Sequence, residues 1–443
     1  MPMVIAANIC ALGHWAQTLA MTFGEWQQLA PEAAAREVRR RAEAHLSAGQ
    51  RKAVVAALLD EHALAAGFAA APLGSPLRGI PYLLKDLFDV DGLPTRAGSS
   101  FLPEVRPNPG QESRIVRDLR EAGAVLSGKT HLFEFGWGLT GENAHYGDCE
   151  HPRFPGRTSG GSSSGSAAAV AADIVPFAVG TDTGGSMRVP AAFCGIFSYR
   201  GIPRDPRISD AVALAPSFDT VGWFTRTAAD MRVALAALVG LRTSERTPRG
   251  CYLDVPGLEP DVAAACRDAA SGLAKPADAS VRDELLRKFA SAAEIYGVLA
   301  GTESWKIHKK WADKYRARYG PLVQERLDRA RAISRAQIAA VEPSFAALKL
   351  TWGQFFQTYD FLVMPATPFA ALTKAECVHA NRLRILGLTA PAALGGLPVL
   401  TFPVALPSGL SAGLQIVVGE PQSPAVSWAL DHSGWGQVSH RPG

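Results

Sequence analysis

Apolar and polar positions alternate along the first half of the chain in patterns typical of helices and strands in turn. Residues 25–70 are rich in Ala, Glu and Arg, which favours helix. After the turn-like stretch APLGSPLRG, the apolar run Ile80–Leu84 indicates a strand, with Lys85 at its end. Residues 112–122 place four apolar side chains on one face of an amphipathic helix. The two patterns continue to alternate to about residue 240, which predicts an α/β layered architecture.

The second half of the chain returns to strand patterns after a long helical stretch. Residues 241–250 contain Pro, Arg and Thr and are the best candidate for a linker. Residues 280–358 have mostly helical patterns, strand-like runs return from Phe361, and no internal repeat is evident. Because strand patterns occur in both parts, we expect one domain over residues 1–443. We divide it into an N-terminal helical segment (1–70), a mostly helical excursion (241–358) and C-terminal strands that complete the sheet (359–420).

One long uncharged stretch raises the question of a membrane span. No charged residue occurs between Ile385 and Gly419, which is longer than a bilayer-spanning helix requires. Four prolines and a Gly–Gly pair interrupt it, and they would break a single helix repeatedly. The runs Pro398–Val404 and Ala412–Val418 are typical of buried strands. We therefore predict part of the core here and no membrane association.

Composition narrows the class of protein. The chain is 47% apolar and 19% charged, as in ordinary globular proteins, and its net charge is only +4. The basic stretches near residues 36–41 and 306–335 are interleaved with Glu, Asp and Ala, as on solvated helix faces. We therefore expect no nucleic-acid partner.

The cysteines and the amino terminus indicate a cytoplasmic protein. The six cysteines show no paired short spacing, so we expect reduced thiols and neither a zinc site nor a redox motif. The opening residues, MPMVIAANICALGHW, contain an apolar run but lack the basic region of a secretory signal. We interpret them as an ordinary structural element.

The stretch GAVLSGKT, residues 123–130, matches the pattern of a phosphate-binding loop. Such a loop needs a strand before its glycines and a helix after its lysine, so that helix amides face the phosphate. Here the helix comes first, and Ala124–Leu126 form an apolar, strand-like run. We interpret the match as accidental and Lys129 as a surface or structural lysine at a strand end.

A second Gly-rich stretch, Thr158–Gly195, carries serines in two loops. It continues directly into an apolar helix-and-strand pattern, which is not typical of a flexible linker. A serine nucleophile needs a base, and only His145 and His151 lie near these loops in the sequence. A buried lysine can replace histidine, because desolvation lowers its pKa. Pattern alone, however, makes Lys85 an ordinary ion-pair partner of the adjacent Asp86.

The segment from Gly79 to Leu235 contains longer motifs that are more specific than any single Gly-rich pattern. In order they are RGIPYLLKDLFDVDGLPTRAGS, EAGAVLSGKTHLFEF, GENAHYG, GGSSSGSAAAVAA and GTDTGGSMRVPAAFCG. This segment resembles the signature core (79–235) of the amidase signature family of serine hydrolases, and YDFLVMPATP and GLQIVV extend the likeness more weakly. The resemblance implies a single α/β/α layered domain in which helices cover a mixed central sheet. It also implies hydrolysis of a carboxylic amide without a metal or cofactor, and a homodimer is common among such relatives.

The resemblance further implies a Ser–Ser–Lys triad. Ser186 matches the nucleophile that becomes acylated, and Lys85 matches the general base. Ser162 matches the bridging serine, whose preceding peptide bond is cis in the family. The backbone N–H groups of Thr183, Gly184, Gly185 and Ser186 are then candidates for an oxyanion hole. Supporting roles fall to Gly161 beside Ser162 and to Asp182 and Arg188, which we expect to form a charge pair that holds the nucleophile loop; Ser163, Ser164 and Ser166 are expected to cap free helix amides.

Two departures from the family pattern bear on the substrate. In the glutaminase branch, which serves a tRNA-dependent amidotransferase, an Arg and an Asp hold the amino-acid substrate. The matching positions are Phe345 and Leu386, both apolar, which favours a small uncharged or aryl/alkyl amide over glutamine. Thr158 and Ser159 also replace a common small-residue–Pro pair. The alternatives that remain are a hydrolase of biuret-like or dicarboxylic amides, the glutaminase subunit of such an amidotransferase, and a catalytically silent scaffold subunit.

Overall fold

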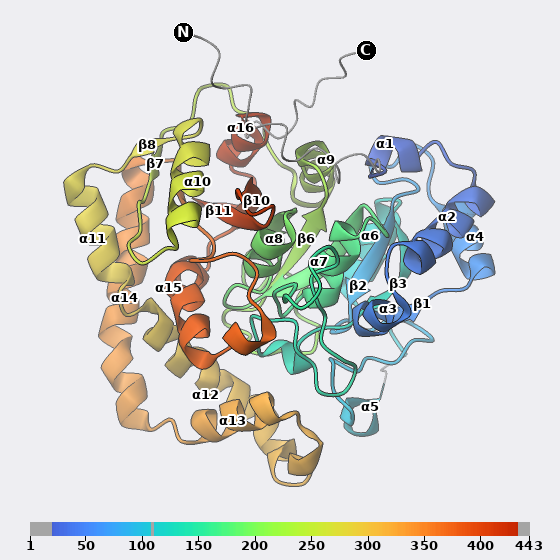
Figure 1. Ribbon diagram of the computed structural model, residues 1–443, viewed down its shortest axis with the longest axis horizontal. Helices are drawn as coiled ribbons and strands as arrows, with labels where there is room; N and C mark the ends of the chain where they lie inside the picture. Colours follow the sequence, from blue (N-terminus) through green and yellow to red (C-terminus); the bar gives the residue numbers. More distant parts are fainter. Residues whose placement is uncertain (1–19, 108–109, 433–443) are drawn as a thin grey trace.

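An eleven-stranded mixed β-sheet runs through the computed structural model, which describes residues 20–107 and 110–432 (Figure 1). Its strand order is β1-β3-β2-β4-β6-β5-β10-β11-β9-β7-β8. In chain order the strands are β1 (Val55–Leu58), β2 (Pro81–Lys85), β3 (Val125–Thr130), β4 (Phe177–Asp182), β5 (Phe197–Arg200), β6 (Thr220–Thr225), β7 (Gly250–Tyr252), β8 (Lys275–Pro276), β9 (Phe361–Pro365), β10 (Val399–Ala405) and β11 (Ser411–Val418).

Parallel and antiparallel pairs share this sheet. β2 lies parallel to both β3 and β4, and β7 lies parallel to both β8 and β9. The remaining neighbours are antiparallel, including β5 with β10, where the two halves of the chain meet. Because strands from both halves of the chain belong to this one sheet, the chain forms a single α/β domain.

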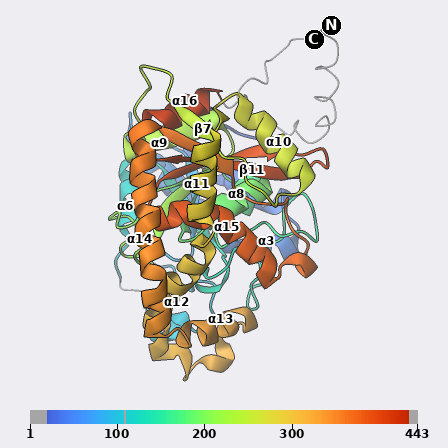
Figure 2. The same ribbon diagram turned by 90° about the vertical axis from the view of Figure 1, so that its left-hand side faces the viewer.

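Helices surround the sheet. They are α1 (Phe23–Trp26), α2 (Pro31–Ala44), α3 (Ala48–Val54), α4 (Glu61–Ala70), α5 (Leu102–Val105), α6 (Arg114–Glu121), α7 (Ser164–Ala171), α8 (Arg188–Cys194), α9 (Ala228–Val239), α10 (Pro260–Ser271), α11 (Ala279–Phe289), α12 (Ala292–Ala312), α13 (Pro321–Arg331), α14 (Arg335–Thr358), α15 (His379–Gly395) and α16 (Pro424–His432). α2, α3 and α4 lie beside the β1 end of the sheet, and α11, α12 and α14 stand together at the other end (Figures 1 and 2).

Apolar side chains account for the central elements. Every residue of β2 and β4 is buried, because helices cover both faces of these strands. α6 buries three apolar side chains, as its amphipathic pattern predicts. α7 is buried along its whole length and packs on β2, β4 and α8. The middle of the sheet is therefore fixed by packing on both sides.

Residues 25–70 differ from the all-helical expectation. β1 lies between α3 and α4 and adds an edge strand antiparallel to β3. Composition did not indicate it, because two of the four residues in Val55–Leu58 are alanines. The helical excursion likewise contributes two short strands, β7 and β8, to the opposite edge.

The uncharged stretch lies inside the domain, as the sequence indicates. Pro398–Val404 corresponds to β10 and Ala412–Val418 to β11, so both predicted strands are confirmed. Pro391 was expected to break a helix, but it lies within α15, which ends instead at Gly395 and is followed by Gly396 in the left-handed conformation. No helix in residues 20–107 and 110–432 is long and apolar enough to cross a bilayer. The prediction for MPMVIAANICALGHW lies outside the described residues.

Candidate active site

Two neighbouring parallel strands end at the same edge of the sheet and bring the predicted residues together. β2 ends at Lys85, and β4, paired with it in parallel, ends at Asp182. The loop that carries Ser162 leads into α7, which packs against both strands. The carboxyl ends of parallel strands are where α/β proteins usually place their functional groups.

Lys85 is completely buried, and three hydroxyl groups surround its amine. Its Nζ lies 2.8 Å from Ser162 Oγ, 2.9 Å from Ser163 Oγ and 2.8 Å from Thr181 Oγ1. No carboxylate of the described residues contacts it, since the adjacent Asp86 pairs with Lys129 instead. The ion pair with Asp86 that the residue pattern suggested is therefore not formed.

The hydrogen atoms around Lys85 can be assigned from these contacts. Ser163 Oγ donates its hydrogen to the Thr181 carbonyl at 3.0 Å and accepts from the Thr181 N–H at 3.2 Å. Ser163 can therefore only accept from the amine. Ser162 Oγ contacts no acceptor other than Lys85 among the described residues, so its hydrogen is free to point toward the amine.

Burial controls the charge of this amine. It lowers the pKa of Lys85 to about 7, while the negative charges of Asp182 and Asp219 oppose the shift. Desolvation disfavours the charged form of a base, because water no longer stabilises the ammonium. A large fraction of Lys85 is therefore neutral near pH 7, with a lone pair available to accept a proton.

Close backbone packing fixes Ser162. The Gly161–Ser162 peptide bond is cis, as the resemblance implies. Gly161 N donates to the Leu139 carbonyl at 3.0 Å. A Cβ on Gly161 would lie 2.0 Å from the Thr140 carbonyl oxygen, so no larger residue fits there.

Ser186 lies where the chain turns from β4 into α8. The residue is only 3% exposed, and its Oγ forms no hydrogen bond within the part of the chain that the structure describes. Its carbonyl accepts from Ser163 N at 3.4 Å, which links the two serine loops. The backbone N–H groups from Thr183 to Ser186 likewise donate to no acceptor among the described residues. Free donors beside a free hydroxyl suit a site that receives a developing negative charge.

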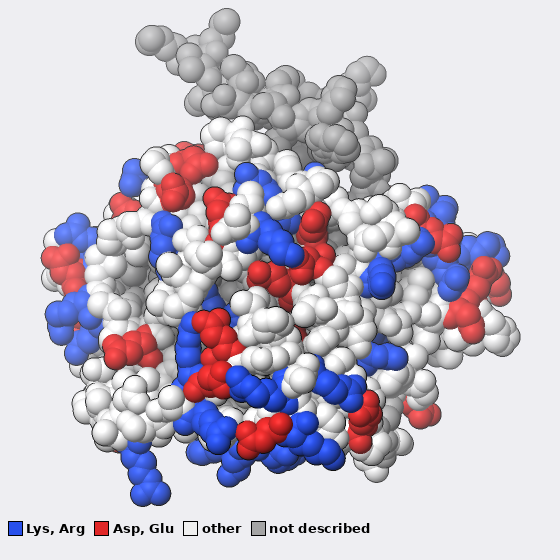
Figure 3. Space-filling view, turned by 60° about the horizontal axis from the view of Figure 1, so that its bottom comes forward, with Lys and Arg blue, Asp and Glu red and all other residues white. Residues whose placement is uncertain are grey.

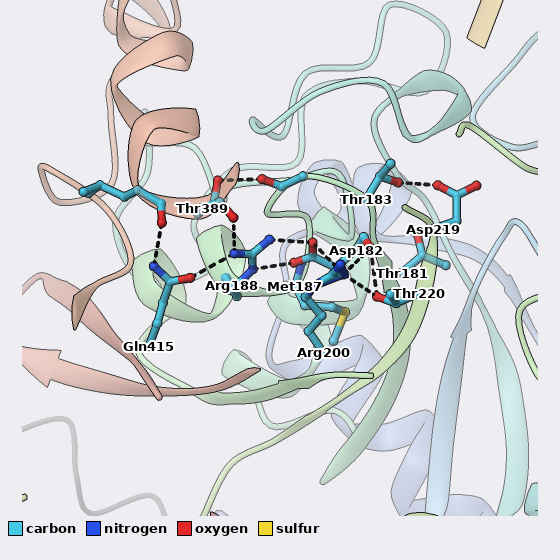
Figure 4. A network of polar contacts seen from close by, with 12 residues as sticks. Thr181, Asp182, Thr183, Met187, Arg188, Arg200, Asp219, Thr220, Thr389 and Gln415 are labelled. Atoms are coloured by element: carbon cyan, nitrogen blue, oxygen red, sulfur yellow. Dashed lines mark hydrogen bonds and ion pairs between the residues drawn. The ribbon is translucent and has the colours of Figure 1, made fainter. Parts of the chain in front are cut away.

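A buried network holds this turn from below (Figure 4). Asp182 Oδ2 accepts from Met187 N and from Arg188 Nε, both at 3.0 Å, and Arg188 Nη2 donates to Asp182 Oδ1 at 2.9 Å. Arg188 Nη1 also donates to the Thr389 carbonyl at 2.6 Å and to Gln415 Oε1 at 2.9 Å. Burial raises the pKa of Asp182, but the charges of Arg188 and Arg200 outweigh it and hold that pKa far below its usual range.

Two residues outside the turn, Asp219 and Thr389, also fix its shape. Thr183 Oγ1 donates to Asp219 Oδ1 at 2.6 Å, and Asp219 Oδ2 accepts from the Leu214 and Ala215 N–H groups at 2.9 and 3.0 Å. Gly185 has φ +149°, and a Cβ there would lie 2.9 Å from Thr389 Oγ1. The geometry of the 183–186 turn is thus set from both sides.

The capping role expected of three serines is wrong, whereas one of the two roles expected of Lys129 is confirmed. Ser163, Ser164 and Ser166 make no capping hydrogen bond to the start of α7. Ser163 bonds to Lys85 and β4, Ser166 Oγ donates to the Val179 carbonyl, and Ser164 Oγ is buried without a partner among the described residues. Lys129 is buried within β3. Of the two roles expected for it, a surface or a structural lysine, the structure supports the structural one.

The positions expected to be apolar near the substrate belong to one hydrophobic cluster. Leu386 is buried on α15, and Phe345 on α14 lies with its ring 6.4 Å from that of Phe218. Phe218 in turn contacts Tyr296, whose ring packs where a Gly184 side chain would be. The cluster therefore reaches the 183–186 turn.

Sequence reasoning missed several contributors. Thr181 could have been found from the sequence. It stands two residues before Thr183, and side chains two apart along a strand point to the same face. Asp219, Thr389 and Gln415 lie far away along the chain, and no local pattern connects them to the site. No group of three His, Cys, Asp or Glu side chains in residues 20–107 and 110–432 is placed to hold a metal ion.

Comparison with known proteins adds independent findings. The Amidase family model matches residues 36–295. A glutamyl-tRNA(Gln) amidotransferase subunit from Chloroflexus aurantiacus is 32% identical, over 78% of this chain and 80% of its own length. An indoleacetamide hydrolase from Pseudomonas savastanoi is 42% identical, but the match spans under half of either chain, 46% of each. A crystal structure of an amidase superposes with a TM-score of 0.79 at 30% identity, covering 92% of this chain and 96% of that one.

Proposed function

This chain belongs to the Amidase family, and we propose on that basis that it hydrolyses the C–N bond of a carboxylic amide through an acyl-enzyme on Ser186. The observation that carries the proposal is the buried Lys85 amine, 2.8 Å from Ser162 Oγ and with a pKa near 7. Few structural lysines are buried without a carboxylate partner, because the isolated charge is costly.

The first half of the reaction forms the acyl-enzyme. Neutral Lys85 accepts the proton of Ser162, and Ser162 accepts the proton of Ser186 as Ser186 Oγ attacks the amide carbon. The free backbone N–H groups of residues 183–186 stabilise the oxyanion of the tetrahedral intermediate. Removing one such donor typically costs on the order of 3 kcal/mol in the barrier.

The second half releases the products. The proton on Lys85 returns through Ser162 to the leaving nitrogen, so the amine or ammonia departs neutral. Water then attacks the acyl-enzyme with the same relay acting as base, and the acid leaves. Asp182 and Arg188 touch no substrate in this scheme; they hold the turn that carries Ser186.

The glutaminase alternative has less support. The relative named above is one component of a glutamyl-tRNA(Gln) amidotransferase, and that similarity covers most of both chains. Leu386, however, is buried in an apolar cluster and offers no carboxylate to the ammonium of an amino acid. An unpaired ammonium in such surroundings costs several kcal/mol. A catalytically silent scaffold is disfavoured because all three triad side chains are present.

The test is an assay of ammonia release from a panel of amides, combined with labelling by a fluorophosphonate. We expect hydrolysis of at least one amide and a single labelled peptide containing Ser186. Ser186→Ala should lower kcat by at least about 10³-fold and abolish labelling. Ser164→Ala is the matched control, because Ser164 is also a buried serine of this region but its hydroxyl has no partner among the described residues. Equal activity in wild type and Ser186→Ala would end the proposal.

A further inference from the structure

The exposed face of α14 has few of the charged side chains that a surface helix normally presents to water. Between Ala336 and Thr358 the charged residues are Glu342 and Lys349 alone. The opposite face of the helix is buried and contains Val341, Leu348, Thr351, Trp352 and Phe355. The outer face is therefore exposed to solvent and yet mostly uncharged.

Neighbouring surface helices have a different composition. α11, which packs beside α14, has five charged residues among its eleven, namely Arg282, Asp283, Glu284, Arg287 and Lys288. In Figure 3, side chains of both charges crowd over the lower centre, where α13 lies, whereas the lower left, on the side of α14 in Figure 1, is mostly uncharged. α14 also runs as a long rod near the margin of the molecule (Figure 2). Another molecule can therefore approach its outer face.

This face has an exposed leucine and a hollow in its second half. Leu350 is 69% exposed. A shallow hollow of about 880 Å³, largely open to solvent, is lined by residues of α14 alone, namely Ala346, Lys349, Leu350, Gly353, Gln354 and Gln357. The first half of the face has no such hollow, because most of its exposed residues are short, namely Ala336, Ala339, Ala340 and Pro343. The two halves of one face thus differ in shape.

The two charged residues lie on the same stripe as the hollow. Residues seven apart in an α-helix lie within about 20° of each other around the axis and about 10.5 Å apart along it. Glu342 and Lys349 are seven apart, and Ala346 lies between them. Neither forms an ion pair with a described residue. Lys349 Nζ lies 5.2 Å from the centre of the Phe345 ring, which keeps the lysine on this face.

The charges are complementary to those of a second copy of α14 in antiparallel orientation. With a two-fold axis beside Ala346, Glu342 lies within about 1.5 Å, along the helix axis, of the level of the partner's Lys349. Both side chains are then on the same side of the contact. The two-fold axis repeats this contact, because residue i meets residue j and residue j meets residue i. One arrangement therefore forms two ion pairs.

The apolar residues match in the same arrangement. Pro343 meets the partner's Leu350, and Ala339 meets the partner's Gly353, so that the short residues of one copy enter the hollow of the other. Leu350 then loses its contact with water, which favours association. Shape, charge and apolar surface thus agree on one pairing.

We propose that α14 forms the interface of a homodimer, in which two copies pack antiparallel about a two-fold axis beside Ala346 and Glu342 of each subunit pairs with Lys349 of the other. This inference is independent of the proposed function, because it involves no chemistry at Ser186. One pair of helices buries a small area, and interfaces of small area are weak or transient. We therefore expect a dissociation constant in the micromolar range.

The test is sedimentation velocity on the full chain at about 1 to 200 µM. The weight-average mass of wild type should rise from 47.0 kDa towards twice that value as the concentration increases. Glu342→Lys and Lys349→Glu should each raise Kd at least about tenfold, because two contacts between like charges replace two ion pairs. Glu43→Lys is the control, since it reverses the same charge at an exposed position of α2, at the opposite end of the sheet.

A mixture of the two charge variants tests the pairing itself. Equimolar Glu342→Lys and Lys349→Glu should form a heterodimer about as tight as the wild-type dimer, because both contacts again join opposite charges. Ala346→Arg places two like charges at the axis and should keep the chain monomeric, and circular dichroism should show an unchanged fold because Ala346 is exposed.

Three results would overturn the inference. They are a wild-type mass that stays at 47.0 kDa at every concentration, a dimer that the α14 variants weaken no more than Glu43→Lys does, and a mixture of the two charge variants that stays monomeric. The first result would leave the outer face of α14 to a different protein. None of the three would affect the proposed function.

Discussion

Lys85 and its three hydroxyl neighbours show how hydrogen-bond direction separates similar side chains. Ser162 and Ser163 are adjacent, and both lie within 3 Å of the amine. Ser163 gives its hydrogen to the Thr181 carbonyl, so of these two serines only Ser162 can take the relay role of the proposed mechanism. The sequence GGSSSGS indicates a serine-rich turn, but without the resemblance to a family it does not distinguish these two serines. That distinction depends on Thr181 of β4, which lies 18 residues after Ser163 in the chain.

The charge of Asp219 provides a prediction at this scale. Asp219 raises the pKa of Lys85, opposing the effect of burial. Asp219→Asn removes that charge, so the pKa of Lys85 falls and more of the amine is neutral at low pH. Because the neutral amine is the base in the proposed mechanism, the acidic limb of kcat/KM should move to lower pH. A profile between pH 5 and 9 checks this, and a limb that moves to higher pH would contradict the assignment of Lys85.

At the scale of elements, the turn between β4 and α8 is the feature on which the site depends. Asp182 at the end of β4 neutralises Arg188 and lies 3.6 Å from Arg200, and all three are buried. The sequence predicts the pair of Asp182 and Arg188, because both flank one short loop. It does not predict Arg200, Thr389 or Gln415, since strand pairing brings them in from distant segments.

Breaking this network should destabilise the fold. Asp182→Asn leaves two buried guanidinium groups without their counter-charge, which typically costs about 3–5 kcal/mol. Urea unfolding followed by circular dichroism would measure the loss. Asp254→Asn is the control, because its ion pair with Arg267 is exposed and should contribute less than about 1 kcal/mol. Equal stabilities of the two variants would show that the network is not a structural support.

Element boundaries illustrate the limits of local pattern. β10 and β11 were predictable, since long β-branched and apolar runs favour buried strands. β1 was not, because its short alanine-containing sequence forms a strand only through pairing with β3. Pro391 did not end α15, because the helix is buried from Leu388 to Leu394 and this packing offset the missing hydrogen bond.

At the scale of the whole molecule, one sheet joins the two ends of the described chain. β5 from the first half pairs with β10 from the second, and β9, which follows the helical excursion, pairs with β11. The alternation of helix and strand patterns predicted the α/β class, and strand patterns in both halves predicted a single domain. The strand order could not be predicted from pattern alone, because many orders satisfy the same periodicity.

The shared sheet predicts cooperative unfolding. Neither half can lose its strands without exposing the hydrogen-bonding edge of the other, so we expect one thermal transition. Differential scanning calorimetry should give a calorimetric enthalpy within about 20% of the van't Hoff enthalpy. Two resolved transitions would show that the halves are independently stable.

The most direct test of the account is the rate at which a fluorophosphonate labels Ser186 as pH is varied, because labelling requires no knowledge of the natural substrate. In wild type the rate should rise about tenfold per pH unit below pH 7 and level off above it, following the pKa of Lys85. In Lys85→Met the rate should fall by at least about 10³-fold at every pH. Labelling of Ser186 that is as fast in Lys85→Met as in wild type would contradict the claim that the buried neutral amine activates the nucleophile.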